Sequence, residues 1–404
     1  MIGFIAGESV ARATPVREPG LAPDKRRSLF VTLAAIGGNL PDLDLVYSYR
    51  DMHSAQGKLQ YMLQHRGYTH TVVGCLILVV LLYAGAEWWL RRTHQSLTLR
   101  DRLEIAGLCL FGTFLHLGMD FLNSYGIHPF WPLQDSWVYG DSVFIVEPLY
   151  WAAAAPLVFV ARSVVVRVII ALALLAGFAL SCFSGLVPAL PRIVFWVLTL
   201  VLLVVGSRAP ARMAAFASAV VMIAVTATFM LAGRAAARTV ESVAAARFPG
   251  EQLVDHVLTP APMNPLCWDL LLLETRADRY IVRRGLVSNA PALMPAARCP
   301  VMGGARAARG ELSSESAGVY WLKELEMSKA LLSKVVADHC DAAALMRFAR
   351  VPFVNGPADR PVISDLRFDR GRGGGMASIP LGEPAAGACS EPAPWIPPRL
   401  DLLR

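Results

Sequence analysis

Long apolar segments alternate with short polar ones over the first 233 residues of the chain. Segments of about 17 to 25 apolar residues can cross a bilayer as helices, and slightly shorter ones can do so with help from flanking residues. Such segments are residues 71–90, 103–122, 145–161, 168–183, 193–206 and 213–233. Residues 28–42 form a further candidate, and residues 1–11 look like part of another. The pattern predicts an all-α polytopic membrane domain of about six to eight helices.

The remaining chain is more polar and richer in Pro and Gly. Residues 279–287 and 361–368 are typical of strands, whereas residues 322–349 favour a helix. We therefore expect a mixed α/β or β-rich soluble domain after the membrane domain. The predicted units are a transmembrane metal-site domain at 1–234, an extracytoplasmic soluble domain at 235–370, and an irregular Pro/Gly-rich tail at 371–404.

Composition and charge agree with a membrane protein. Hydrophobic residues make up 55% of the 404 residues and charged residues 17%, which is too apolar for an ordinary soluble chain. The net charge of +7 accompanies no phosphate loop or nucleic-acid motif, so we expect no nucleic-acid partner. Lys and Arg gather in alternate loops, at 12–27, 91–102, 162–167 and 208–212. These loops should be cytoplasmic, which places residues 42–70, 123–144 and everything after 233 outside.

The cysteines fall into two groups. Three lie in apolar segments and act as small hydrophobic residues: Cys75, Cys109 and Cys182. The others lie in the polar part without a CxxC pair, which argues against a zinc ribbon: Cys267, Cys299, Cys340 and Cys389. If that part is extracytoplasmic, disulfides can form, and the sequence leaves all three pairings of the four cysteines open.

The first polar cluster with possible chemistry is Asp42 and Asp44, directly after the apolar segment that ends at Pro41. In an extended segment, side chains two residues apart point the same way, so both carboxylates could face one ion. The alternative is a polar helix end among lipid headgroups.

The second cluster is His65 and His70, just before an apolar segment. On one continuous helix the two imidazoles would point in different directions, so a shared metal requires a helix to begin between them. Gly67 permits the break and Thr69 could be the N-cap. The alternative is a pair of histidines that pack at the membrane interface.

The third cluster is His116 and Asp120 inside an apolar segment. Residues four apart share a helical face, as two ligands of one metal must. Ionisable groups in a membrane span are costly and usually face a partner or a cavity, although a structural His–Asp hydrogen bond would also explain the pair. The topology puts all three clusters at the outer face, and we expect them to converge there.

A fourth segment, residues 139–148, begins the next apolar run from the same side. Its carboxylates, Asp141 and Glu147, could act as a general base or as additional ligands. Either could instead be a carboxylate that a helix N-terminus favours.

These clusters together resemble a family of bacterial inner-membrane metal-dependent hydrolases that includes a LexA-regulated member. The resemblance rests on four segments: Gly38 to Asp44, His65 to His70, His116 to Gly126, and Asp141 to Tyr150. Further likenesses suggest the long form of the family, with a soluble C-terminal domain: Asn264-Pro265-Leu266, Trp268, Arg347-Phe348 and Asp365 to Phe368. The family's activity is itself inferred. Its His and Asp pattern resembles that of zinc-dependent phospholipase C, which implies phosphoester substrates.

The chain departs from the family pattern at two places. Family members usually open with a Thr-His segment before a Gly-rich helix, whereas this sequence starts at Met1 within that helix, so one ligand implied by the resemblance is missing. A misplaced start or a loss of activity would both explain this. Glu147 stands where the family often has Asp.

The function predicted from the sequence is that of a membrane-bound metal-dependent hydrolase acting at the outer membrane face on an ester or phosphoester of a lipid or lipid-linked molecule. One or two divalent metals, zinc being favoured by the imidazoles, would activate water. The expected ligands are Asp42, Asp44, His65, His70, His116 and Asp120. The expected catalytic residues are Glu147, Asp141 and Arg66. The sequence defines no oligomeric partner.

Two functions of other classes fit the same residues. A proton or metal-ion transporter would use the intramembrane His and Asp residues as a relay and show flux without product. A non-catalytic envelope protein would keep the metal for structure alone.

Overall fold

The structure is a computed structural model. It describes residues 1–14, 20–49, 51–95, 97–302, 314–357, 360–369, 375–383, 389, 393 and 399–403. Much of the expected irregular tail at 371–404 lies outside the described residues.

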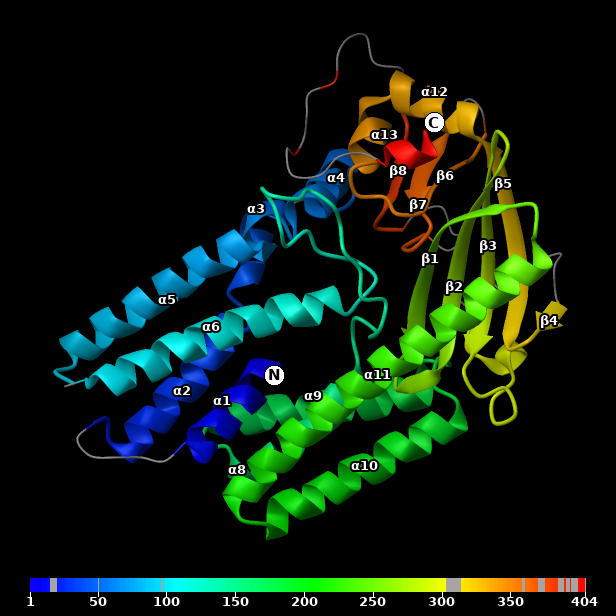
Figure 1. Ribbon diagram of the computed structural model, residues 1–404. Coiled ribbons are helices and arrows are strands. Elements are labelled where there is room, and N and C mark those ends of the chain that lie inside the picture. The colour runs from blue at the N-terminus through cyan, green and yellow to red at the C-terminus, as the bar shows by residue number, and fades with distance from the viewer. Residues whose placement is uncertain are drawn as a thin grey trace.

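Helices make up the N-terminal part, on one side of the molecule in Figure 1. Among the described residues, five are long and apolar enough to cross a membrane, or six if the bent pair Pro23–Gly37 and Pro41–Ser48 is one span. The α-helices are α1 (Ile2–Ala13), α2 (Pro23–Gly37), α3 (Leu45–Ser48), α4 (Ala55–Gln64), α5 (Val72–Arg92), α6 (Leu99–Phe121), α7 (Pro148–Ala153), α8 (Leu157–Val160), α9 (Val164–Phe183), α10 (Ala189–Arg208) and α11 (Ala211–Arg247). Short 3₁₀ turns, η1 (Pro41–Asp44) and η2 (Tyr68–His70), lie between them.

One predicted span is wrong. Residues 145–161 were expected to form one helix, but they form the short helices α7 and α8 with a turn between them. Proline has no N–H for a helical hydrogen bond and its ring clashes with the preceding turn, so Pro156 ends one helix and begins the next. The interior of this segment is buried against other helices, with Ala152 to Ala155 fully covered.

The C-terminal part contains two antiparallel sheets and confirms the expected fold class. Within the described residues the larger sheet has the order β1-β2-β3-β5-β4 and the smaller one β6-β7-β8. The strands are β1 (Gln252–Ala261), β2 (Asn264–Arg276), β3 (Arg279–Ser288), β4 (Ser314–Ser316), β5 (Val319–Ser328), β6 (Pro352–Asn355), β7 (Val362–Asp365) and β8 (Ser378–Pro380). The short helices α12 (Lys329–Asp338) and α13 (Cys340–Leu345) follow β5. The 3₁₀ turn η3 (Ala296–Arg298) lies between β3 and β4, and η5 (Leu400–Leu402) follows β8.

The strand predictions at 279–287 and 361–368 are confirmed by β3 and β7, but the helix predicted at 322–349 begins too early. Residues up to Ser328 belong to β5, which pairs with β3 along its length, with Leu325 opposite Val282. The Leu, Lys, Glu and Met residues here favour a helix locally, and the long-range pairing overrides that preference.

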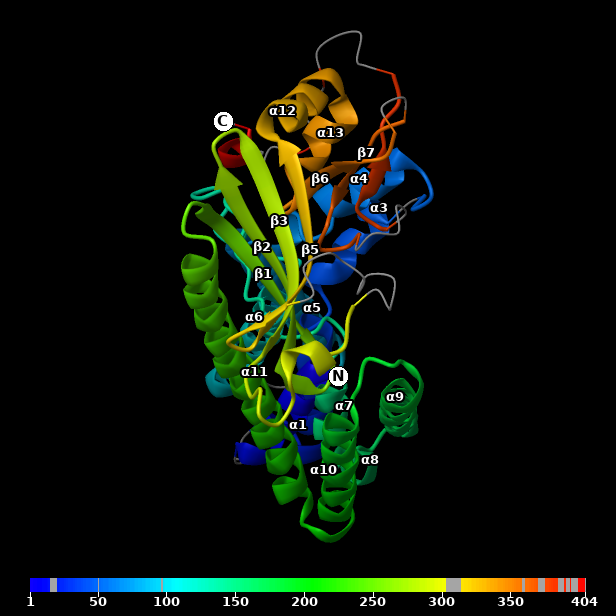
Figure 2. The same ribbon diagram turned by 90° about the vertical axis from the view of Figure 1, so that its right-hand side faces the viewer.

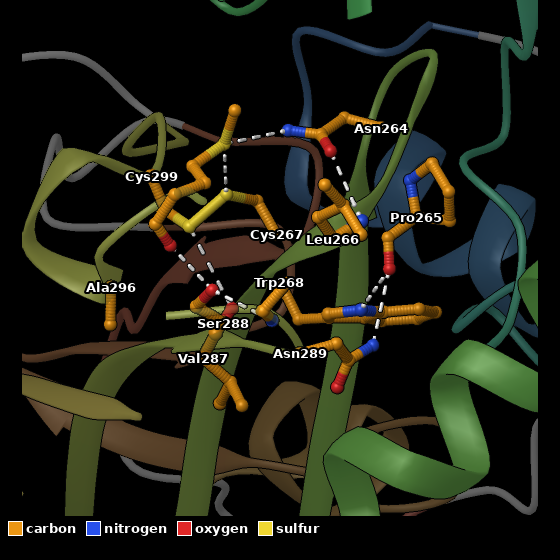
Figure 3. The surroundings of a disulfide bond; sticks show 12 residues. Asn264, Pro265, Leu266, Cys267, Trp268, Val287, Ser288, Asn289, Ala296 and Cys299 are labelled. Atoms are coloured by element: carbon orange, nitrogen blue, oxygen red, sulfur yellow. Dashed lines mark hydrogen bonds between the residues drawn. A yellow bond between two sulfur atoms is a disulfide. The ribbon is translucent and has the colours of Figure 1, made fainter. Parts of the chain in front are cut away.

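The four cysteines of the C-terminal part form two disulfides among the described residues. Cys267 pairs with Cys299, next to the start of β2 (Figure 3), and Cys340 pairs with Cys389. The sequence left the pairing open, and this is the pairing that the fold selects. Cys75, Cys109 and Cys182 are free.

The two parts of the molecule share apolar cores. Helix α11 runs without a break across residue 234, the expected domain boundary, and its C-terminal half packs on β1 and β2 (Figures 1 and 2). At a rise of 1.5 Å per residue its 37 residues extend roughly 55 Å, well beyond a hydrocarbon core of about 30 Å. Helix α4 packs likewise against α13 and β8. The soluble part is therefore held against one end of the helical part.

Candidate metal centre

Three short pieces of chain bring the predicted clusters together. Asp42 lies in η1, which follows α2, and His70 lies in η2, which precedes α5. His116 and Asp120 lie one turn apart near the end of α6. Ligand atoms of these residues all lie within 4.8 Å of one another, so the group could hold a metal ion.

The distances within this group match a tetrahedral metal site. His70 Nε2 lies 3.2 Å from His116 Nε2, 3.2 Å from Asp120 Oδ2 and 3.5 Å from Asp42 Oδ1. His116 Nε2 lies 3.4 Å from Asp42 Oδ1 and 3.5 Å from Asp120 Oδ2. Ligand atoms on a tetrahedron around zinc, with bonds of about 2.0 to 2.1 Å, lie roughly 3.3 to 3.4 Å apart. The five distances are close to those of a tetrahedral metal site.

Both imidazoles are oriented for metal binding. A histidine binds a metal through Nε2 only when Nδ1 carries the proton, so Nδ1 needs an acceptor. His116 Nδ1 lies 3.0 Å from the Gly38 carbonyl oxygen, and His70 Nδ1 lies 3.1 Å from Asp44 Oδ2. The second contact makes a carboxylate–histidine pair of the kind that supports metal-bound histidines.

Asp44 lies behind the ligands rather than among them. Its carboxylate is fully buried and lies within hydrogen-bonding distance of His65 Nδ1, the Arg66 backbone N–H, Thr69 Oγ1 and His70 Nδ1. Three of these contacts are to Oδ2 and one is to Oδ1, so both oxygens have partners. Asp42, Asp44 and His65 also form a possible ligand group by distance. Because the Asp44 carboxylate already has hydrogen-bond partners, a single metal held by Asp42, His70, His116 and Asp120 is favoured.

The expected extended segment around Asp42 is a 3₁₀ turn, which changes the role of Asp44. Successive residues of a 3₁₀ helix are about 120° apart, so residues two apart point in different directions. Asp42 therefore faces the two Nε2 atoms, while Asp44 faces the opposite edge of His70. The predicted helix break between His65 and His70 is present, but the N-cap of α5 is Thr71 and not Thr69.

Asp120 is held by Arg66. The Arg66 guanidinium donates to Asp120 Oδ1 at 2.9 Å and to the Asp120 carbonyl at 3.2 Å. Asp120 Oδ2 is buried and makes no hydrogen bond to the described residues, and it lies toward the two Nε2 atoms. A buried carboxylate oxygen without a hydrogen bond is costly, and a bound cation would satisfy it. Arg66, expected as a catalytic residue, lies where it positions a ligand.

The other two catalytic candidates are engaged by the C-terminal part. Asp141 accepts from Arg350 at 2.7 Å, and burial raises the pKa of Asp141 even though Arg350 lowers it. Glu147 caps α7 through the Leu149 N–H and also accepts from the Met263 N–H in the turn between β1 and β2. Neither belongs to the ligand groups found among the described residues.

A pocket of about 340 Å³ adjoins the cluster. His116 and Asp120 line it, and so does Glu147. Its other walls are mostly apolar and come from α1, α6, the chain before α7 and α7 itself, including Ile2, Met119, Val143, Ile145, Val146 and Trp151. The group of His and Asp side chains is thus accessible from the pocket, and the Asp42 side chain is 37% exposed.

Several residues around this centre were missed from the sequence. Thr69 contacts Asp44 and His70, and the Gly38 carbonyl orients His116. Arg350 and Arg367 reach the membrane part from the C-terminal part. Thr69 lies inside the His65 to His70 motif and could have been suspected. Arg367 lies in the Asp365 to Phe368 likeness, but both arginines are more than 200 residues from their partners in the helical part, and no local pattern marks those contacts.

Residues 1–189 match the family model described as YdjM inner membrane protein. The matched region contains the whole candidate metal centre. Comparisons with curated proteins and with solved structures gave no match. Together with the long apolar helices, the family match supports a multi-pass protein of the inner membrane.

Proposed function

We propose that the protein is a membrane-bound metal-dependent hydrolase that cleaves an ester or phosphoester bond in a lipid or lipid-linked molecule. The observation that carries the proposal is that His116 and Asp120 belong both to the metal-ligand group and to the wall of the pocket. A metal in this group would be accessible to a molecule bound in the pocket.

Asp42, His70, His116 and Asp120 would hold the metal, and zinc suits this mixture of imidazole and carboxylate ligands. When bound, such a metal supplies Lewis-acid polarisation of the substrate and activation of a water nucleophile. The residues behind it fix the ligands: Asp44 orients His70, and Arg66 orients Asp120.

The shape and surroundings of the pocket support a lipid substrate. Its walls are apolar, and Ile145 and Val146 on its rim are 65% and 43% exposed on a segment next to the membrane helices. An acyl or polyprenyl chain could lie against these walls with its polar head at His116 and Asp120. A water-soluble ester would gain little from such a lining.

The outer face is the proposed location of the centre and of the C-terminal part. The two disulfides support it, because such bonds form and persist in oxidising compartments. The distribution of Lys and Arg among the loops supports the same orientation.

This orientation predicts the labelling of introduced cysteines. With the free cysteines at 75, 109 and 182 replaced by alanine and the disulfides kept, Arg100→Cys and Gln134→Cys should react with a membrane-impermeant thiol reagent from opposite sides, and Gln134→Cys from outside. Reaction of both from the same side would refute the orientation.

The proposed reaction is tested with the full chain in vesicles of bacterial phospholipids. Supplied with zinc, it should release a product from a lipid ester or phosphoester, and Asp120→Ala should release none. Zinc or proton flux without any product would favour the transporter, and zinc binding with neither flux nor product would favour a structural site.

A substitution at Glu147 tests its role in proton transfer. Glutamine keeps an oxygen that can accept from the Leu149 and Met263 amides, so Glu147→Gln should retain the α7 cap. If Glu147 handles the proton, turnover should fall by about 10² to 10⁴ while zinc stays bound. Unchanged turnover would restrict Glu147 to capping.

A second candidate, a structural metal site, is favoured by the number of side-chain ligands. Four protein ligands complete a tetrahedron, as in structural zinc sites, whereas catalytic zinc commonly has three and an open position. The exposed Asp42 carboxylate is the ligand that could leave or share its position. The Asp42→Ala variant therefore distinguishes a hydrolase from a structural site. If the site is catalytic, the variant should still bind zinc, with reduced affinity. If the site is structural, zinc should no longer raise the thermal stability of the variant.

A further inference from the structure

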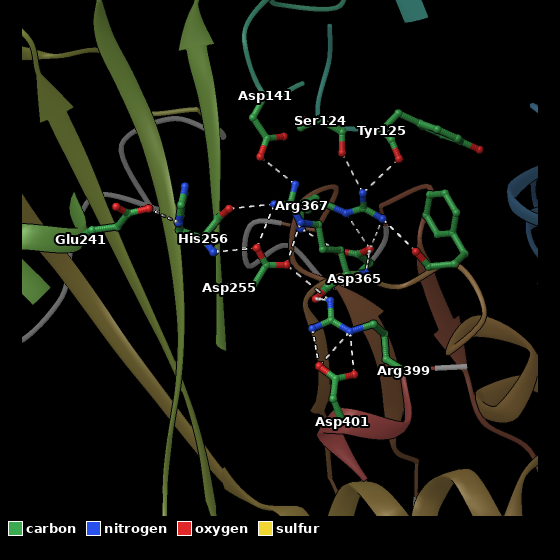
Figure 4. Close-up of polar contacts among 12 residues, drawn as sticks. Ser124, Tyr125, Asp141, Glu241, Asp255, His256, Asp365, Arg367, Arg399 and Asp401 are labelled. Carbon is green, nitrogen blue, oxygen red and sulfur yellow. Dashed lines mark hydrogen bonds and ion pairs between the residues drawn. The ribbon is translucent and has the colours of Figure 1, made fainter. Parts of the chain in front are cut away.

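A chain of contacts connects the C-terminal part to the metal centre. It begins at Arg367, a buried residue after β7 whose guanidinium is held by Asp365 at 2.7 and 2.9 Å. The same guanidinium donates across to the helical part, to the carbonyl oxygens of Ser124 at 2.7 Å and Tyr125 at 3.1 Å (Figure 4). Arg367 thereby fixes the turn that follows α6.

The turn at 123–126 holds the Arg66 side chain in place. The Asn123 side-chain oxygen accepts from the Tyr125 N–H at 2.9 Å and from Arg66 Nη1 at 3.1 Å. The Gly126 carbonyl accepts from the same Nη1 at 3.1 Å. Gly126 has a φ of +90°, which a residue with a side chain rarely adopts. The turn thus aims two acceptors at one guanidinium nitrogen.

Contacts of aromatic rings make a second link between Arg66 and the C-terminal part. The Arg66 guanidinium lies over the Tyr125 ring, 4.6 Å from its centroid. On the C-terminal side, Tyr125 contacts Phe348 at 4.9 Å and Phe368 at 5.7 Å between centroids. Both routes therefore link the same piece of the C-terminal part to Arg66.

Arg66 is the last link before the ligands. Its Nη2 binds Asp120 Oδ1, which leaves Oδ2 facing His70 and His116. If the turn at 123–126 moved, Arg66 would lose two of its acceptors and Asp120 would be free to rotate. The orientation of one ligand thus depends on a residue of the C-terminal part, some 240 positions away in the sequence.

We propose that Arg367 is a positioning residue of the metal centre, acting through the turn at 123–126 and Arg66 on Asp120. The inference rests on the proposed metal centre and adds a role for the C-terminal part: docking of this part sets the geometry of the centre. Separation of the two parts would therefore weaken metal binding without removing any ligand.

The test is the zinc affinity of the full chain in detergent, measured by competition with a chromophoric chelator. Arg367→Gln should lower the affinity by about 10-fold, as loss of an outer partner of a metal ligand typically does. Asn123→Ala, which breaks the next link without removing a charge, should have a similar effect. The double variant should lose about as much as one single variant, because both break the same chain of contacts.

The matched control is Arg284→Gln. Arg284 is also a buried arginine of the C-terminal part and is paired with Asp269, but its partners lie within that part. It should lower thermal stability yet keep the zinc affinity within about two-fold.

Two results would overturn the inference. The first is that the Arg367→Gln variant binds zinc no more weakly than the Arg284→Gln variant. The second is that the fold loss of zinc affinity in the double variant, Arg367→Gln with Asn123→Ala, equals the product of the losses in the two single variants. If the unsubstituted chain binds no zinc, the proposed function fails and this inference fails with it. Zinc binding by the unsubstituted chain with no effect of Arg367→Gln overturns the inference alone.

Discussion

Substituting His116 with alanine should lower the affinity of the full chain for zinc by more than about 100-fold while the protein still inserts. Loss of an outer partner of a ligand costs 10- to 100-fold, and loss of the ligand itself should cost more. Insertion depends on the apolar surface of α6, which this substitution leaves intact. Zinc affinity and the yield of folded protein, measured together, check the prediction.

His53→Ala is the control for this experiment. His53 is exposed and lies in the loop before α4, between η1 and η2 in the sequence, but it is outside the ligand groups found in the described chain. Its removal should leave the affinity unchanged. Equal zinc binding by the His116→Ala and His53→Ala variants would show that His116 is only a packing residue.

Substituting Arg350 with glutamine should cause the largest loss of stability, about 3 to 5 kcal/mol, because it leaves the largely buried Asp141 carboxylate without its cation and leaves Asp255 with only the longer ion pair to Arg399. Arg350 binds Asp141 of the helical part at 2.7 Å and Asp255 of β1 at 2.9 Å. Figure 4 shows these two carboxylates at the junction of the two parts. Its guanidinium also lies over the Tyr139 ring. The midpoint of thermal unfolding in detergent measures the effect.

The pH dependence of this loss follows from Asp255. Burial would raise the pKa of Asp255, but Arg350, together with Arg399 and the His256 N–H, holds this pKa below its ordinary value. A lowered folded pKa contributes stability above the unfolded value of about 3.9 and loses it as the pH falls further. The difference between the unsubstituted chain and Arg350→Gln should therefore narrow below about pH 4.

Arg279→Ala provides the comparison for Arg350. Arg279 pairs with Glu326 at 3.5 Å, but its side chain is half exposed, and such pairs contribute less than about 1 kcal/mol. Similar losses for the two variants would mean that the Arg350 contacts do not hold the two parts together.

The sequence predicted the helical part and singled out polar residues that the fold brings close together, because both depend on local patterns. Apolar segments identify spans, and ionisable residues at a span end are conspicuous against them, as with His116 and Asp120. Their spacing of four residues defines a shared helical face without further information.

The division of roles within the cluster could not be predicted in the same way. Asp42 and Asp44 are chemically identical, and only the 3₁₀ conformation of η1 gives them different directions. Asp42 points toward His70 Nε2, whereas Asp44 points toward His70 Nδ1. The contacts of Asp141 and Glu147 could not be predicted either, because their partners, Arg350 and Met263, come from the other part of the chain. Long-range contacts of this kind leave no periodic pattern in the sequence.

The most direct test of the metal centre is the zinc stoichiometry of the purified full chain. After equilibration with zinc and removal of the excess, elemental analysis should give one zinc per chain, and the combined His70→Ala and His116→Ala variant should give none. A folded chain without bound zinc, or equal zinc content in the two proteins, would contradict the central claim that these side chains form a metal centre.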